Sequence, residues 1–412
     1  MRFAILCSLV VLLLVATPAR TSAQDGNDES PPPPTLVDVG DLLRHVRHKN
    51  ASDGDGYSAA PAKRFFVVAP TMTAKPSTGL TLGLSGNMAF VDGDPKTTHI
   101  SSVSGGVRVT QKQQTLSGAR LSMFTADDRW FVQGDGRMSW TSLNAYSLGG
   151  NAPLSSGENF KFDALRLYET AYRKVGRRVF VGAGLNVSDH GNIRPASSSG
   201  SAEGAFDVYS EANGFSDEHQ QSAGTNVALL VDTRDNSINA DRGWLASSTY
   251  RTFYNGFLGG DSTWQELGVD LRTYRRLRPD GRQKLAFWLL GDFVTGGVAP
   301  YFDLPSTGGD LSGRMARGYT EGRFRGPQLM YGEVEYRNTL VPSGLVGFVA
   351  FLNTTTVGGD VTGEKLFQSF EPGTGLGLRV LLNKHSKTNL CVDYGWGVQQ
   401  SRGLYLALQE AF

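Results

Sequence analysis

The sequence predicts an all-β protein: a transmembrane antiparallel β-barrel of about 16 strands, with a long sixth extracellular loop folded into the lumen. Three observations predict it. Apolar and polar side chains alternate from Phe65 onwards, the alternating segments number sixteen, and every long connection follows an odd-numbered segment. An even strand number, with short turns on one rim and long loops on the other, is typical of outer-membrane barrels. A soluble β-sandwich explains the alternation but does not require two classes of loop.

The first 23 residues are predicted to be a cleaved secretory signal peptide. Arg2 precedes the apolar run Phe3–Ala16, and small residues lead up to Ala23. The shortness of the apolar run disfavours the alternative of an uncleaved membrane anchor. Cys7 would leave with the signal, so Cys391 would remain as the single cysteine, which excludes an internal disulfide and a cysteine-based metal site.

Charge and hydropathy argue against a nucleic-acid partner and against membrane-spanning helices. The 40 Lys and Arg include Arg2 and Arg20, so the mature chain would keep 38 against 39 Asp and Glu, and a nucleic-acid partner is not favoured. After the signal, no apolar run approaches the length of a membrane-spanning helix. Strands of about ten alternating residues can still cross a membrane, and the 51 glycines suit that class.

Residues 24–62 are predicted to be a periplasmic linker with one short helix. Apolar residues recur at helical spacing between Thr35 and His48. We expect this helix to lie on an apolar surface of the protein. The alternative is a functional plug, but an amphipathic helix is explained by packing its apolar face on such a surface alone.

Residues 63–412 are predicted to form the barrel. Its sixteen segments begin near Phe66, Leu80, Ser101, Thr115, Arg129, Asp163, Arg177, Thr225, Gly243, Ser262, Gln283, Leu329, Leu345, Thr374, Thr388 and Gly403. The long connections, 142–161, 189–220, 299–327 and 358–371, all follow odd-numbered segments, which places them on the extracellular rim.

The stretch Gly308–Asn338 joins a long Gly/Arg-rich loop to a strand with charges on one face. Glu333, Glu335 and Arg337 alternate with Val334 and Tyr336. We therefore expect this loop to fold back towards a polar lumen.

The chain ends in a segment with Leu404, Leu406, Leu408 and Phe412 on one face of a final strand. This pattern resembles the C-terminal insertion signal of outer-membrane barrels. Glu410 departs from it, since an apolar or aromatic residue is more usual there.

The segment Gly308–Asn338, together with the motif residues named below, resembles the BamA/TamA superfamily, and the resemblance covers residues 65–412. The resemblance implies that Arg317, Gly318 and Tyr319 form a loop tip in the lumen, where Arg317 pairs with Glu335 on the following strand. Further matching barrel motif residues are Asp232, Arg234, Asp235, Gly243, Asp393 and Gly395.

Two departures from the superfamily bear on function. Only about 40 residues separate the signal from the barrel, so the periplasmic POTRA modules are missing, and Asn353 stands where a second acidic partner is expected. Arg317 should therefore rely more on Glu335, because a buried guanidinium must be paired. The alternative is that Arg317 is a solvated loop arginine like Arg314, Arg323 and Arg325.

Catalytic and cofactor sites are not predicted. Ser188, Asp189 and His190 are adjacent, so their side chains point apart along a strand. The six histidines have no carboxylate or cysteine at metal-ligand spacing. The glycine-rich segment around Gly375 has no following helix to bind a phosphate.

The resemblance implies a bacterial outer-membrane protein that takes part in insertion, translocation or passage of polypeptide or lipid. The alternative is a passive porin-like or structural barrel. Expected partners are outer-membrane lipids and either a periplasmic protein or further copies of the chain.

Overall fold

The computed structural model describes residues 36–41, 64–75, 79–196, 204–310 and 314–412. The predicted signal peptide and most of the linker, including most of the helix expected between Thr35 and His48, lie outside these ranges. Within the described part of that helix, residues 39–41 form a helical turn. None of the described helices is long and apolar enough to cross a membrane.

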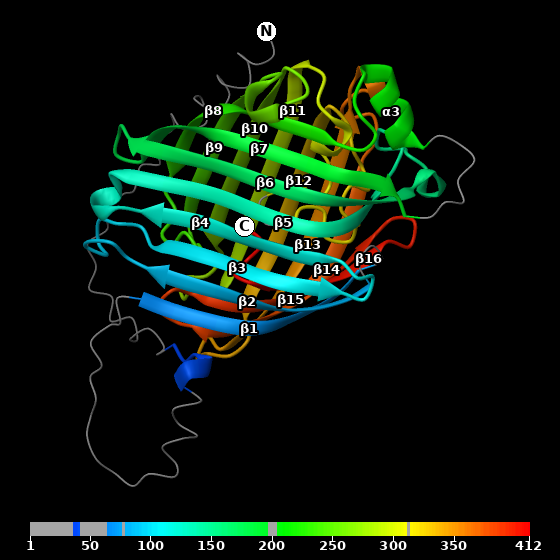
Figure 1. Ribbon diagram of the computed structural model, residues 1–412. Helices are drawn as coiled ribbons and strands as arrows, with labels where there is room; N and C mark the ends of the chain where they lie inside the picture. The colour runs from blue at the N-terminus through cyan, green and yellow to red at the C-terminus, as the bar shows by residue number, and fades with distance from the viewer. Residues whose placement is uncertain (1–35, 42–63, 76–78, 197–203, 311–313) are drawn as a thin grey trace, which may run out of the picture.

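Sixteen antiparallel strands close into one barrel in sequence order, with β1 beside β16 (Figure 1). The strands are β1 (Arg64–Lys75), β2 (Gly79–Phe90), β3 (Ser101–Thr110), β4 (Thr115–Phe124), β5 (Trp130–Ala145), β6 (Glu158–Lys174), β7 (Val179–Pro195), β8 (Gln220–Asp232), β9 (Gly243–Phe253), β10 (Trp264–Arg276), β11 (Gln283–Gly297), β12 (Gln328–Thr339), β13 (Val346–Gly358), β14 (Glu371–Asn383), β15 (Thr388–Gly397) and β16 (Arg402–Leu408). The predicted antiparallel β-barrel of sixteen strands is confirmed.

The longest connections lie on one rim, as the sequence predicts, although the connections after β1, β3 and β15 on that rim are short. The long ones follow odd strands: 146–157 after β5, 196–219 with helix α3 (Ala205–Asn213) after β7, and 298–327 after β11. The turns after even strands are shorter, such as 125–129 after β4 and 384–387 after β14. Figure 1 places α3 at one end of the barrel and the helical turn 39–41 at the other.

Alternation along the strands separates an apolar outer surface from a mixed lumen. Leu84, Val107, Val109 and Leu352 are exposed on the outside, as expected for a band that contacts lipid tails. Their neighbours along each strand face inward. Trp130 and Trp140 stand at opposite ends of the outward face of β5, a placement typical of aromatic girdles.

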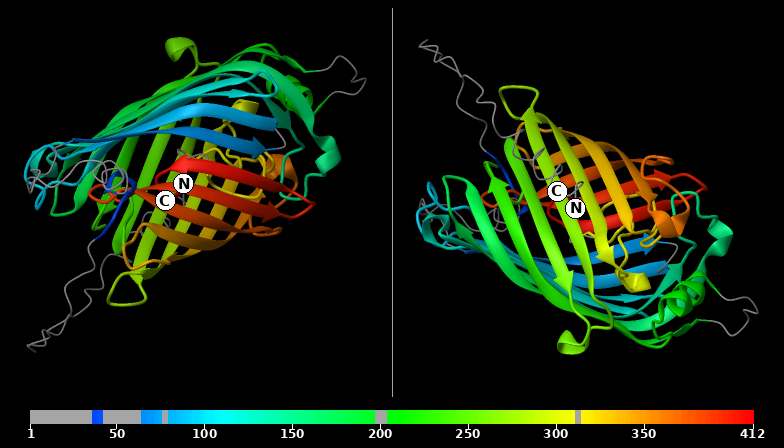
Figure 2. Two further views of the ribbon diagram at one scale, coloured as in Figure 1. Left: turned by 90° about the horizontal axis from the view of Figure 1, so that it is seen from below. Right: turned by 90° about the horizontal axis from the view of Figure 1, so that it is seen from above.

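The segment between β11 and β12 lies within the barrel, where the two views of Figure 2 show it beside the closing strands. Met315, Ala316, Tyr319 and Phe324 of this segment are buried and pack in one cluster with side chains of β10 to β13. This burial gives the loop an apolar body that holds it against one side of the wall.

Residues 36–41 dock on the turns of the opposite rim. The backbone N–H of Val37 donates to the carbonyl of Ser343 at 2.8 Å, and Asp38 accepts from the N–H of Lys384 at 3.0 Å. The carboxylate of Asp41 pairs with the Lys384 ammonium at 2.7 Å. The chain entering the barrel is therefore tied to the short turns β12–β13 and β14–β15.

The end of the chain differs from the prediction. β16 ends at Leu408, because Gln409 adopts a left-handed φ of 80° and turns the last residues inward. Phe412 packs in the lumen against Trp288 and Tyr274, with ring centroids 5.2 Å and 6.2 Å apart. Phe412 therefore does not share the outward face of Leu404 and Leu406, and Figure 1 marks the C-terminus inside the barrel outline.

Candidate functional site

The tip of the loop between β11 and β12 carries a fully buried arginine. Arg317 is 0 % exposed, and its guanidinium contacts the carboxylates of Glu333 and Glu335 on β12 and of Asp393 on β15, the last at 2.6 Å. Burial by itself lowers the pKa of the Arg317 guanidinium, but Glu333, Glu335 and Asp393 raise that pKa well above its ordinary value. The side chain therefore stays charged and ties two strands to the tip.

The charges around this tip balance. Arg337 pairs with Glu335 at 2.6 Å, and Arg379 pairs with Asp393 and, at 2.7 Å, with Glu410. With Arg314, which lies 3.5 Å from Asp393, the described residues form a network of four arginines and four carboxylates: Arg314, Arg317, Arg337, Arg379, Glu333, Glu335, Asp393 and Glu410. Such a network is stable only when each member has a partner, since a buried charge without one is very costly.

Backbone contacts fix the tip as well. Gly318 has a φ of 115°, and a Cβ there would lie 2.7 Å from the carbonyl of Trp396. At Gly395 a Cβ would lie 2.8 Å from the Gly318 nitrogen. The tip and β15 therefore touch through their main chains, which only glycine allows at these positions.

Two tyrosine hydroxyl groups, those of Tyr405 and Tyr319, also hold the loop tip in place. The N–H of Gly318 donates to the Tyr405 hydroxyl at 3.0 Å, and this hydroxyl donates to the carbonyl of Tyr319 at 3.1 Å. The Tyr319 hydroxyl donates to the carbonyl of Pro372 and accepts from the N–H of Val398 at 3.1 Å. Strands β14 to β16 thus hold the tip by direct hydrogen bonds.

We expect Gly395→Ala to destabilise the folded barrel by about 1–3 kcal/mol, because the added methyl group would meet the backbone of the tip, which has no flexible atom to move. The urea concentration at half-unfolding, read from the heat-modifiable band on gels, measures the effect. Gly332→Ala on β12 is the matched control, since a Cβ there meets nothing within 4 Å. Equal midpoints for the two variants would contradict the close approach.

The structure brings together some of the predicted site residues and adds others. Asn353 donates to the main-chain carbonyl of Arg317 at 3.2 Å, so it contacts the tip through the backbone and not through the guanidinium. The hydrogen bonds of Tyr405 to the tip were not predicted from the sequence, nor was the ion pair between Asp393 and Arg317. The stacking of the guanidinium 3.8 Å above the ring of Phe351 was not predicted either. The alternation that puts Glu333 on the face of Glu335 was the one available signal.

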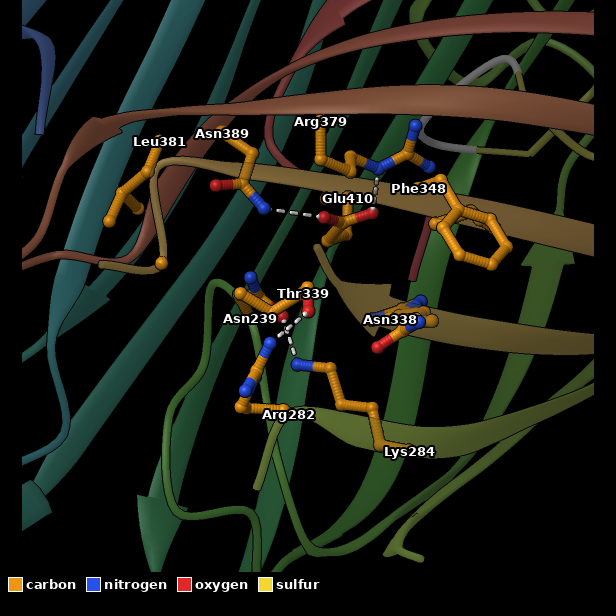
Figure 3. Close-up of a pocket in the computed structure, with 14 residues that line it drawn as sticks. Asn239, Arg282, Lys284, Asn338, Thr339, Phe348, Arg379, Leu381, Asn389 and Glu410 are labelled. Carbon is orange, nitrogen blue, oxygen red and sulfur yellow. Dashed lines mark hydrogen bonds and ion pairs between the residues drawn. The ribbon is translucent and has the colours of Figure 1, made fainter. Parts of the chain in front are cut away.

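The inward turn of the chain end gives Glu410 a role in the same network. Figure 3 shows its carboxylate between Arg379 and Asn389, which donates to it at 2.8 Å. Arg337 donates to the main-chain carbonyl of Phe412 at 3.1 Å, and Arg314 to that of Gln409 at 2.8 Å. The chain end and the loop tip therefore share one set of arginines.

The second predicted block lies apart from the tip, at the short turn between β8 and β9. Arg234 grips the Asp232 carboxylate with two bonds, of 2.7 and 3.0 Å, and Asp235 accepts from the N–H of Asp241 at 2.9 Å. Gly243 has a φ of 108°, and a Cβ there would lie 2.4 Å from the carbonyl oxygen of Thr233. None of these bonds reaches Arg317.

Other polar groups in the described part of the chain are engaged elsewhere. Ser188 donates to Asp303 at 2.6 Å, and Asp189 lies 2.9 Å from His219. These contacts join strands to loops and do not align Ser188, Asp189 and His190 with one another. Within the described ranges, no three His, Cys, Asp or Glu side chains are grouped so that they could hold a metal ion.

Comparison with known proteins gives likeness of structure only. No family model and no curated protein match the sequence. BamA from Haemophilus ducreyi lacking POTRA domains 1–3 is 12 % identical, with a TM-score of 0.53 over 84 % of this chain and 69 % of that chain. CdiB from Acinetobacter baumannii is 13 % identical, with a TM-score of 0.52 over 84 % of this chain and 59 % of that chain. The resemblance stated from the sequence is thus confirmed in its fold: the chain has the outer-membrane β-barrel fold of BamA and CdiB.

Proposed function

We propose that this protein acts in the bacterial outer membrane, in the insertion, translocation or passage of polypeptide or lipid. The observation that carries the proposal is the seam between the first and last strands. β1 and β16 share one register pair, Ala74 with Leu404, whereas β15 and β16 share seven and β1 and β2 share twelve. This seam is the weakest strand pairing of the barrel.

The weak pairing leaves most of β1 as a free edge. The pair at Ala74 lies near the extracellular end of β1, so among the described residues Arg64–Thr73 has no partner on the β16 side. An unpaired strand edge offers its N–H and C=O groups to another strand. An entering polypeptide could pair there and move sideways into the bilayer.

The loop tip supports this mechanism by holding the chain end. Arg314, Arg337 and Arg379 bind the last four residues inside the lumen, away from β1. We propose that this network sets how far the seam is open, with the tip as an internal strut.

The outer surface and the rim of the barrel suggest partners. We propose that outer-membrane lipids surround the apolar band and that a periplasmic protein, or a further copy of the chain, delivers the cargo. The docked residues 36–41 lie at the periplasmic turns where such a partner would meet the barrel.

A disulfide across the seam tests the proposal. In a Cys391→Ala background, Ala74→Cys with Leu404→Cys would join β1 to β16, and Val392→Cys with Leu406→Cys, partners within β15–β16, would be the matched control. Each protein is reconstituted in liposomes with an unfolded outer-membrane barrel as cargo, and folded cargo is measured by its heat-modifiable mobility. We expect wild type and control to accelerate folding, and the oxidised seam variant to do so only after reduction.

Two outcomes would overturn the proposal. Either the oxidised seam variant accelerates cargo folding as wild type does, or wild type has no effect on cargo or on lipid movement between leaflets. In the second case, a stable, solute-sized conductance in planar bilayers that Arg317→Ala leaves unchanged would favour the porin-like alternative.

A further inference from the structure

The inner wall formed by β2 to β6 carries arginines that the tip network does not use. Cross-strand register places Ser85, Gly106, Gly118, Arg137 and Arg166 in one row across these five strands. Their neighbours Val107 and Val109 are exposed on the outer surface, so the row faces the lumen.

Two further arginines flank the glycines of this row. Arg108 stands two residues beyond Gly106 on β3, and Arg120 two residues beyond Gly118 on β4, on the same face. Arg137 lies directly opposite Gly118. Arg120 is a diagonal neighbour of Arg137, at about 7–8 Å, whereas Arg108 stands opposite Leu116 and therefore lies on the other side of the two glycines from Arg120. Three long cationic side chains therefore surround a patch of wall that bears no side chains.

The glycines leave room for these arginines. A Cβ at Gly118 would lie 3.5 Å from Cγ of Arg137, and a Cβ at Gly83 would lie 2.5 Å from Cγ of Arg108. A Cβ at Gly106 would lie 2.7 Å from the hydroxyl oxygen of Ser85. The aliphatic parts of the Arg108 and Arg137 side chains therefore lie over glycines, and the Ser85 hydroxyl group lies beside Gly106.

The charges of this wall do not balance, in contrast to those at the loop tip. Arg137 pairs with Asp135 at 2.9 Å, and Arg166 lies 4.0 Å from the same carboxylate. Within the described ranges, the guanidinium groups of Arg108 and Arg120 have neither a hydrogen bond nor an ion pair. Asp135 is the carboxylate of the wall that pairs with an arginine, while Asp310 and Glu321 of the loop between β11 and β12 attract Arg120 and Arg108. The four arginines still outnumber these three carboxylates, so the wall keeps an excess of positive charge.

We propose that the depression floored by Gly106 and Gly118 binds an anion of the phosphate class. Arg108 and Arg120 supply planar donors that match the oxygens of a phosphate group, and Ser85 supplies a hydroxyl donor. Arg137, which already binds Asp135 and the main-chain carbonyl of Asp310, adds positive charge beside them. A dianionic phosphate neutralises Arg108 and Arg120, whose guanidinium groups have no hydrogen bond or ion pair to a described residue. The phosphate comes either from a free solute in the lumen or from the headgroup of a lipid that enters through the seam.

Calorimetric titration of the purified full chain in phosphate-free detergent micelles, with inorganic pyrophosphate as the probe, tests the site. We expect saturable binding to wild type and at least tenfold weaker binding to Arg108→Gln/Arg120→Gln. Neither guanidinium loses a hydrogen bond or an ion pair to a described residue, so this variant should fold, and its heat-modifiable band checks that it does. Arg278→Gln, in the exposed turn after β10, removes a charge outside the lumen and should bind as wild type does.

A second titration separates the two sources of phosphate. Dihexanoyl phosphatidic acid that displaces pyrophosphate from wild type supports a lipid headgroup as ligand, whereas pyrophosphate binding without displacement supports a free solute. The proposal is overturned if wild type does not bind either probe, or if the double variant binds pyrophosphate as tightly as wild type. Neither result depends on the cargo experiment, because the titration requires no insertion activity.

Discussion

Replacing Arg317 with alanine should sharply reduce the amount of folded barrel. The change leaves Glu333, Glu335 and Asp393 buried without their common cation, and removing one member of a buried ion network costs about 3–5 kcal/mol. The heat-modifiable fraction after refolding into lipid vesicles, and its urea midpoint, measure this loss.

Two further variants identify the cause. Arg317→Ala combined with Glu333→Gln should recover part of the midpoint, because Glu333 loses its ion-pair partner in Arg317→Ala, whereas Glu335 keeps Arg337. Arg278→Ala in the exposed turn after β10 removes the same charge from the surface and should change little, since exposed charges contribute little. Wild-type amounts of folded Arg317→Ala protein would refute the strut.

Replacing Phe412 with alanine should also destabilise the barrel, by about 3–5 kcal/mol, which is the usual cost of emptying a buried phenylalanine site. Phe412 is 5 % exposed and packs against Trp288, and the guanidinium of Arg337 lies 5.0 Å above its ring. The same urea midpoint measures the effect.

Leu406→Ala is the matched control for Phe412. Leu406 faces outward, where lipid tails can fill the space that a shortened side chain leaves, so its loss should cost much less. Similar midpoints for Phe412→Ala and Leu406→Ala would mean that both residues face lipid, as the sequence pattern alone suggests.

The fold could be predicted because lipid contact imposes period-two alternation on every strand that crosses the membrane. The same cause explains where strand bounds were missed. β6 begins at Glu158 and β8 at Gln220, both earlier than predicted, because these ends extend beyond the apolar band. There the outward residues contact water, and no alternation distinguishes a strand from a loop.

The candidate site could be predicted only in part. The charged face of β12 pointed to Glu335 as a partner for Arg317, and Glu333 stands on that same face. Asp393 could not be assigned to Arg317 from the sequence, because 76 residues separate them and their proximity depends on closure of the barrel. Glu410 looked like an imperfect insertion signal because its partner Arg379 lies on another strand.

The contacts that seat the loop tip on the last strands have a consequence for the order of folding. Arg317 is 76 residues from Asp393, Gly318 is 87 from Tyr405, and Arg314 is 95 from Gln409. Contacts of such long sequence separation form late, since the entropy of closing the intervening chain must be overcome first. The loop therefore cannot be seated while β15 and β16 are still unpaired. Completion of the sheet and docking of the tip should occur as one late, cooperative event.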